Sequence, residues 1–188
     1  MTTNNPPSTG ASAALLLILL LDLSGAICPA NGDRRRPRYD VFLSHRGPDG
    51  RHKFADHLDS ALRRKRIKVF RDDRDLPRGE KVTEAISRAI DESVFSLLVL
   101  TPGFASSEYC LDELVQIMQS REKGRHRTFP IFKGVSPDDD VADPSSSGLY
   151  KADLDRHKLR YSYERVASWI HALDSISHIA GWEITDQM

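Results

Sequence analysis

A single glutamate, Glu113, has the residue type and the position for chemistry on a bound ligand. It lies in the segment ASSEYCLDEL at 105–114, which follows an almost unbroken apolar run, VFSLLVL, at 94–100. Such a run predicts a strand buried on both faces. Open parallel sheets bind ligands at the carboxyl ends of their strands, where a carboxylate between apolar neighbours can become a working group. The alternative is a solvated surface glutamate, because glutamate is rarely buried.

The helix that carries Glu113 is predicted over 106–121. Ser106 or Ser107 can cap its first free N–H groups. Its core-facing stripe consists of Leu111, Leu114, Val115 and Met118. Glu113 is not on that stripe, but the residues one turn before and after it are also apolar. From the residues alone, a working carboxylate between apolar neighbours and a solvated surface glutamate stay equally open.

Short apolar runs alternate with amphipathic segments from residue 39 onward. Strands are predicted at 39–43, 67–71, 94–100 and 128–132, helices at 54–62, 82–90, 106–121 and 163–173, a long loop at 136–148, and a further segment at 181–184. Tyr163, Val166, Trp169, Ile170 and Leu173 are expected on the inner face of the last helix. The alternation predicts a flavodoxin-like α/β fold, with a parallel sheet of about five strands and helices on both faces.

Two polar loops follow the first and second predicted strands, at 44–49 and 72–79. In a parallel sheet both open on the same edge as Glu113. They are either solvated turns, in which glycine and proline serve the backbone, or the walls of a cleft. In a cleft, their arginines would bind phosphates and the carboxylate would bind a cationic or hydroxylated group.

Missing motifs and the residue composition exclude several kinds of site. No GxGxxG, GxxxxGK[ST] or GxSxG pattern occurs, so dinucleotide-binding, P-loop and serine-hydrolase motifs are absent. Seven histidines without ligand spacing and two cysteines support neither a metal site nor a disulfide framework, and Cys110 is expected as a buried thiol. Formal net charge is zero, and the basic run at 63–68 is expected to form a solvated helix end, so nucleic acid is not favoured as a partner.

Residues 1–38 are predicted to be a hydrophobic leader with a basic linker. Residues 11–21 are apolar apart from Ser12, and four arginines outnumber two aspartates before residue 39. A membrane anchor is favoured over a cleaved signal peptide, because a positive amino-terminal region is missing and the arginines suit a cytoplasmic flank. A disordered leader is the third alternative. The domain would then lie on the cytoplasmic face of a membrane; the alternatives are a soluble cytoplasmic location or the secretory pathway.

Several motifs in family order resemble the plant form of the Toll/interleukin-1 receptor (TIR) domain, over residues 39 to about 185. They are YDVFLSHRG at 39–47, the DD..L.RG pattern at 72–79, ASSEYCLDEL at 105–114, FPIFKGVSP at 129–137 and the Gly-Trp pair at 181–182. The chain is therefore interpreted as a TIR-only protein with a TIR domain at 39–188.

The resemblance implies an NAD⁺ glycohydrolase, of the NAD⁺ nucleosidase or ADP-ribosyl cyclase type, in plant defence signalling. NAD⁺ is the substrate, and no cofactor or metal is implied. Glu113 would be catalytic, stabilising the oxocarbenium-like ribose that remains when nicotinamide leaves. Residues implied to bind the substrate are His45, Arg46, Arg78, Ser107 and Tyr109. Asp112 is expected to serve the helix amino terminus instead.

The resemblance also implies self-association and binding to other TIR domains. Asp56 and His57 stand where the family has a Ser-His pair on its first helix. The family continues past the Gly-Trp pair into a final helix that pairs with this first helix, whereas the chain ends at Met188, so a weaker interface is expected. The alternative function is a non-catalytic scaffold that only binds other TIR domains. His45 replaces the family's usual phenylalanine and Tyr109 its usual tryptophan, so substrate preference could differ.

Overall fold

Five parallel strands form one sheet in the order β2-β1-β3-β4-β5. The structure is a computed structural model that describes residues 37–47, 53–75, 82–124, 126–146 and 148–184. Its strands are β1 (Tyr39–His45), β2 (Val69–Phe70), β3 (Ser93–Leu100), β4 (Arg127–Lys133) and β5 (Trp182–Ile184). Its helices are α2 (Lys53–Arg64), α3 (Asp72–Asp75), α4 (Val82–Asp91), α5 (Glu108–Glu122), α6 (Lys151–Lys158) and α7 (Tyr163–Ser177), with a 3₁₀ turn η1 (Phe104–Ser106) and a π-helical turn η2 (Pro137–Val141).

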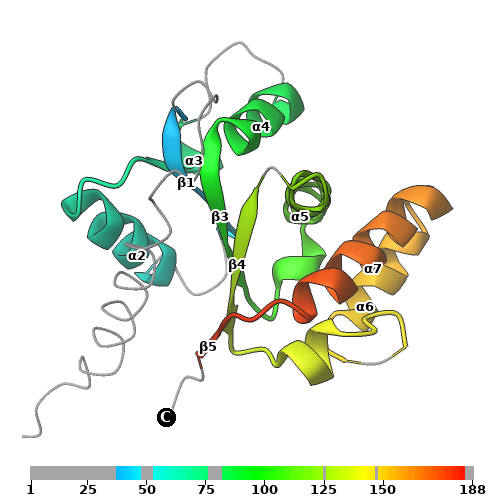
Figure 1. Cartoon of the computed structure of the whole chain (residues 1–188). Coiled ribbons are helices and arrows are strands. Elements are labelled where there is room, and N and C mark those ends of the chain that lie inside the picture. The colour runs from blue at the N-terminus through cyan, green and yellow to red at the C-terminus, as the bar shows by residue number, and fades with distance from the viewer. Residues whose placement is uncertain (1–36, 48–52, 76–81, 125, 147, 185–188) are drawn as a thin grey trace, which may run out of the picture.

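Helices cover both faces of the sheet, which confirms the predicted fold (Figure 1). Helix α2 packs on one face, where its Leu58 and Leu62 meet Val41 and Leu43 of β1. The other face is covered by α4 and α5; α6 and α7 pack outside them, α7 against α5, and add their apolar residues to the same larger core. Successive residues of a strand point to opposite faces, so neighbouring side chains of β1 belong to different cores.

Helix α5 begins where the serines of its first turn predict. Ser107 is the N-cap, and its Oγ accepts a hydrogen bond from the Cys110 backbone N–H at 3.4 Å. Leu111 and Leu114 are fully buried against the sheet, and Cys110 is a buried free thiol, as expected. This start places the first turn of α5 beside the carboxyl end of β1.

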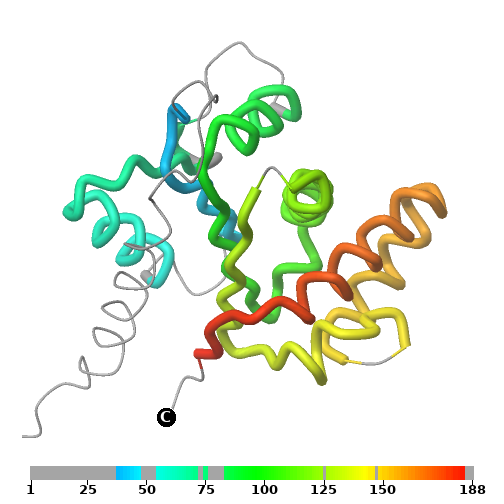
Figure 2. Tube along the Cα trace, in the orientation of Figure 1, coloured from blue at the N-terminus to red at the C-terminus, as the bar shows by residue number. Residues whose placement is uncertain are grey.

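The region between β4 and α7 departs from the expected long loop. It contains the π-helical turn η2, whose Ser136 N-cap accepts from the Asp139 backbone N–H, and the additional helix α6. Figure 2 shows α6 and α7 packed side by side along the chain path. Tyr163, expected to be buried, is 84% exposed, because it is the first residue of α7 and lies beyond the helix's contact with the core.

Gly181 explains the Gly-Trp pair at the start of β5. A Cβ at this position would lie 2.4 Å from the carbonyl oxygen of Pro130 in β4 and 2.7 Å from its ring. Only glycine lets the two backbones approach this closely. The pair therefore serves the docking of the last strand, and Trp182 then packs beside Phe129 on the α2 side of the sheet.

Candidate active site at the carboxyl edge of the sheet

Glu113 lies in the interior, at the carboxyl end of β1. Its side chain is only 3% exposed, and its Oε2 accepts a hydrogen bond from the Ser44 hydroxyl at 2.7 Å. The hydrogen bond joins α5 to β1 across 69 residues of sequence. The alternative interpretation of Glu113 as a solvated surface residue is therefore wrong.

A second contact ties the same turn of α5 to the same strand end. The Cys110 thiol lies 3.9 Å from the backbone carbonyl oxygen of His45, a weak S–H···O contact within the buried region. Cys110 and Glu113 are three residues apart and so share one side of the helix. Together these contacts lock the first turns of α5 against Ser44 and His45.

The side chain of His45 points to the opposite face of the sheet from Ser44. Its Nε2 lies 3.1 Å from Nη2 of Arg71, a fully buried guanidinium just after β2. The imidazole is itself buried. His45 thus directly follows Ser44, the residue that bonds to Glu113, but the ring of His45 faces the α2 side.

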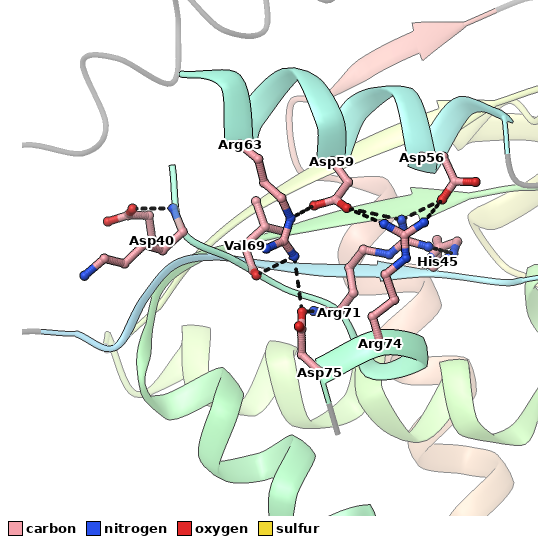
Figure 3. Close-up of polar contacts among 10 residues, drawn as sticks. Asp40, His45, Asp56, Asp59, Arg63, Val69, Arg71, Arg74 and Asp75 are labelled. Atoms are coloured by element: carbon pink, nitrogen blue, oxygen red, sulfur yellow. Dashed lines mark hydrogen bonds and ion pairs between the residues drawn. The ribbon is translucent and has the colours of Figure 1, made fainter. Parts of the chain in front are cut away.

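Arg71 belongs to an ion-pair network that links α2, β2 and α3 (Figure 3). Its Nη1 donates to Asp56 at 2.8 Å and lies 3.6 Å from Asp59. Arg74 donates to both aspartates at 2.9 Å each. On the far side, Arg63 donates to Asp59 at 2.6 Å. Arg74 therefore binds protein carboxylates. If the loop at 72–79 lined a cleft, its arginines were expected to bind phosphates instead.

Asp112, the neighbour of Glu113, has a different role from the one expected. Its Oδ1 accepts from the indole Nε1 of the buried Trp169 at 2.8 Å, and its Oδ2 accepts from Arg165 at 2.5 Å. The Asp112 carboxylate raises the pKa of the Arg165 guanidinium. Asp112 therefore fastens α5 to α7 and does not act mainly on the helix amino terminus.

The other expected substrate-binding residues lie around this strand end or outside the description. Arg46 follows β1 directly and is half-buried. Ser107 is occupied as the N-cap of α5, and Tyr109 on the first turn is 65% exposed. Arg78 lies outside the described residues. Ser107 and Tyr109 share the first turn of α5, while the ring of His45 faces away from it.

The two residues expected to mediate self-association differ in their surroundings. Asp56 is bound within the network through Arg71 and Arg74. His57 is exposed on α2. Of the two, His57 presents the more accessible surface to a partner.

Within the described part of the chain, no group of three or more histidine, cysteine, aspartate or glutamate side chains is arranged to hold a metal ion. No described helix is long and apolar enough to cross a membrane, and the apolar run at 11–21 lies outside these residues.

Sequence reasoning missed Ser44 and Arg71 as residues that shape the site. For Ser44 a signal existed, since strand alternation puts it on the same face as Phe42, which packs in the core with α5. For Arg71 the sequence contained only a weak signal. Acidic residues at 56 and 59, one turn apart on α2, could be recognised as its partners only after β2 had been placed beside that helix.

The buried carboxylate, the strand order and the motif positions can be compared with known proteins. The TIR domain family matches residues 38–188. The chain belongs to this family. Its match begins within one residue of the start of β1 and includes every described element of the fold.

Relatives of this TIR domain are plant disease resistance proteins. Disease resistance protein RPV1 of Vitis rotundifolia is 40% identical over 152 residues, which cover 81% of this chain and 10% of that protein. TMV resistance protein N of Nicotiana glutinosa is 35% identical over 145 residues, which cover 76% of this chain and 12% of that protein. The chain thus spans about a tenth of the length of these relatives.

A solved structure shows the same fold. The TIR domains of the activated Roq1 resistosome, which directly recognises the pathogen effector XopQ, are 36% identical to this chain with a TM-score of 0.70. The likeness covers 77% of this chain and 87% of that one. The plant TIR fold inferred from the motifs is therefore confirmed.

Proposed function

We propose that this TIR domain cleaves the glycosidic bond between nicotinamide and ribose in NAD⁺. Water or the adenine of the same molecule captures the ribosyl carbon. With water, the products are nicotinamide, ADP-ribose and a proton; with adenine, they are nicotinamide, a cyclic ADP-ribose and a proton. Nicotinamide leaves as a neutral molecule because its ring nitrogen is already cationic, so no general acid is required.

The buried Glu113 carboxylate at the carboxyl edge of the sheet carries this proposal. Loss of nicotinamide develops positive charge on the ribose, and a fixed carboxylate in a water-poor site stabilises such charge more than one in water. The Ser44 hydroxyl, 2.7 Å from Oε2, holds the carboxylate in one orientation. A carboxylate that is already positioned before the substrate binds needs little reorganisation energy during the reaction.

The proposal includes defence signalling and assembly. The relatives of this chain are named as disease resistance proteins, and the Roq1 TIR domains belong to a resistosome. By analogy, the chain would self-associate through the α2 surface; the loop that contains Arg78 lies outside the described residues. If the chain binds other TIR domains without cleaving NAD⁺, it is a scaffold instead.

The test compares the full chain with two Glu113 variants in the presence of NAD⁺ and a crowding agent. Glu113→Gln keeps the size of the side chain and an acceptor for Ser44, but removes the charge. Nicotinamide release should fall roughly 100-fold or more in both Glu113→Gln and Glu113→Ala. An inactive wild-type chain that still self-associates would support the scaffold, and equal release from wild type and both variants would exclude Glu113 as the catalytic residue.

A membrane location is proposed for the chain as a whole, with the domain on the cytoplasmic face. Its support is the apolar run at 11–21 followed by arginines at 34–36 and 38. Protease protection of a carboxyl-terminally tagged full chain in sealed microsomes distinguishes the alternatives. A tag that is digested without detergent in the membrane fraction supports the proposal, and a protected tag contradicts it.

A further inference from the structure

We propose that Arg71 is a positioning residue for Glu113, which it reaches through His45 and the end of β1. The inference rests on the proposed cleavage of NAD⁺, because it assigns a role within that reaction. The Arg71 guanidinium contacts His45, Asp56 and Asp59. It holds the strand end that carries the hydroxyl group bound to the carboxylate.

The geometry of residues 44 and 45 makes this connection. Ser44 faces α5 and donates to Glu113, whereas His45 faces α2 and meets Arg71 at 3.1 Å. Consecutive strand residues are joined by one rigid peptide unit, so a shift of the Cα atom of one residue also shifts the Cα atom of the next. The carbonyl of His45, near the Cys110 thiol, adds a third contact to the same unit. The end of β1 is thus held from both faces.

Arg71 itself has little freedom to move. It is 0% exposed, and its guanidinium is set between His45 on one side and the carboxylates of Asp56 and Asp59 on the other (Figure 3). A buried cation is tolerated when it is paired and hydrogen-bonded. The rigid fork of an arginine can bridge several acceptors, which the single ammonium of a lysine cannot do with the same geometry.

The contact also defines the state of the His45 ring. A guanidinium has only N–H donors, so Nε2 of His45 must accept, and the neutral ring carries its proton on Nδ1. A phenylalanine, which the related first-strand motif carries at position 45, could not accept this hydrogen bond.

The effect expected is on the chemical step. A displacement of about 1 Å in a catalytic group can cost on the order of 100-fold in rate. When Arg71 no longer holds His45, Ser44 and the carboxylate it orients gain freedom, and kcat falls. The substrate does not need to contact Arg71 for this, so KM for NAD⁺ should change less than kcat.

The experiment is a double-mutant cycle in the full chain. Arg71→Lys and His45→Phe each remove the 3.1 Å contact, and each should lower kcat for nicotinamide release about tenfold, with KM for NAD⁺ within about twofold for Arg71→Lys. The double variant should lose no more than either single variant, because both disrupt one interaction. Arg63→Gln is the matched control: it breaks another ion pair of the network, does not touch His45, and should retain wild-type kcat.

A second measurement does not depend on activity. Imidazole ¹⁵N chemical shifts of the wild-type chain should show His45 neutral with the proton on Nδ1, and circular dichroism identifies any variant that fails to fold. If Arg71→Lys does not fold, the proposal is tested by kcat of His45→Phe and by the tautomer of His45 in the wild-type chain. An Nε2-protonated ring, an unchanged kcat in His45→Phe, or additive losses in the double variant would overturn the role of Arg71 while leaving NAD⁺ cleavage intact. A wild-type chain that releases no nicotinamide contradicts the proposed function and this inference together.

Discussion

Asp112 and Glu113 are adjacent carboxylates with separate tasks. Glu113 turns to β1 and Ser44, whereas Asp112 turns to α7 and binds Trp169 and Arg165. Helical geometry separates consecutive side chains by about 100°, which suffices to direct one into the site and the other into a helix contact. In the proposed reaction, Glu113 acts on the ligand and Asp112 does not.

Replacing Asp112 should reduce stability and spare the reaction. Asp112→Ala leaves the buried indole N–H of Trp169 without its acceptor, which costs about 2 kcal/mol. For a domain of this size the melting temperature should fall by roughly 4–8 °C. Asp112→Asn keeps an acceptor oxygen and should cost less. Calorimetry and nicotinamide release on the same samples check both parts; a loss of release in folded Asp112→Asn would contradict this division of tasks.

At the residue scale, the sequence reasoning identified the central carboxylate and misjudged its surroundings. The apolar neighbours of Glu113 on the helix left burial and exposure equally open, and the structure decides for burial. The partners of Asp112 could not be predicted, because Arg165 and Trp169 lie more than 50 residues away on a helix whose docking depends on the complete fold. His45 was expected to face the substrate, but its ring lies on the α2 side against Arg71, a partner that could be recognised only once β2 had been placed.

At the element scale, β3, β4 and the helices next to them enclose a buried histidine at the edge opposite the site. His126, just before β4, bonds through Nε2 to the Ser96 hydroxyl of β3 at 2.7 Å. Burial lowers its pKa from 6.5 to about 4 and outweighs the nearby Asp91 carboxylate. The ring is therefore neutral in the folded protein over most of the pH range in which it would be charged in the unfolded chain.

This shift makes folding stability depend on pH. As pH falls below 6.5, the unfolded chain takes up a proton that folded His126 does not accept until about pH 4, so stability is lost across that window. The loss attributable to this residue is on the order of 3 kcal/mol. Urea unfolding at pH 7 and pH 4.5 should therefore show a smaller decrease in His126→Gln than in wild type. The exposed His178→Gln serves as the control, and an equal decrease in wild type and His126→Gln would contradict the assignment.

Elements with strong periodicity were predicted well, and short ones were not. The apolar runs of β1 and β3 and the stripe of α4 sufficed to locate those elements. Helix α6 was missed because its segment, KADLDRHK, is mostly charged and offers few apolar residues to a periodic pattern. Its Leu154 and His157 are nevertheless buried, and His157 bonds to the carbonyl oxygen of Ala105 at 2.9 Å. Tertiary contacts of this kind are not visible in local sequence.

At the scale of the whole molecule, the proposed assembly through α2 depends on which residues of that helix remain accessible. Asp56 is committed to Arg71 and Arg74, and His57 faces solvent. Concentration-dependent sedimentation should show weaker self-association for His57→Ala than for wild type. His171→Ala, at an exposed position on α7, should behave as wild type. Equal association of all three proteins would place the interface elsewhere.

The fold of the whole molecule was the most predictable level, since alternation of strands and helices and the order of the motifs both indicated it. The activity, the leader at 1–38 and the loop containing Arg78 stay predictions. They depend on a substrate, a membrane or a partner, and none of these leaves a periodic signal in the chain.

The described sheet is bounded by its two smallest strands, β2 with two residues and β5 with three. A short edge exposes few unpaired backbone groups and is a poor template for another chain to extend the sheet. The domain can therefore be concentrated with little risk of amyloid-like stacking. Copies that meet are directed to side-chain surfaces, where single substitutions can tune or abolish the contact.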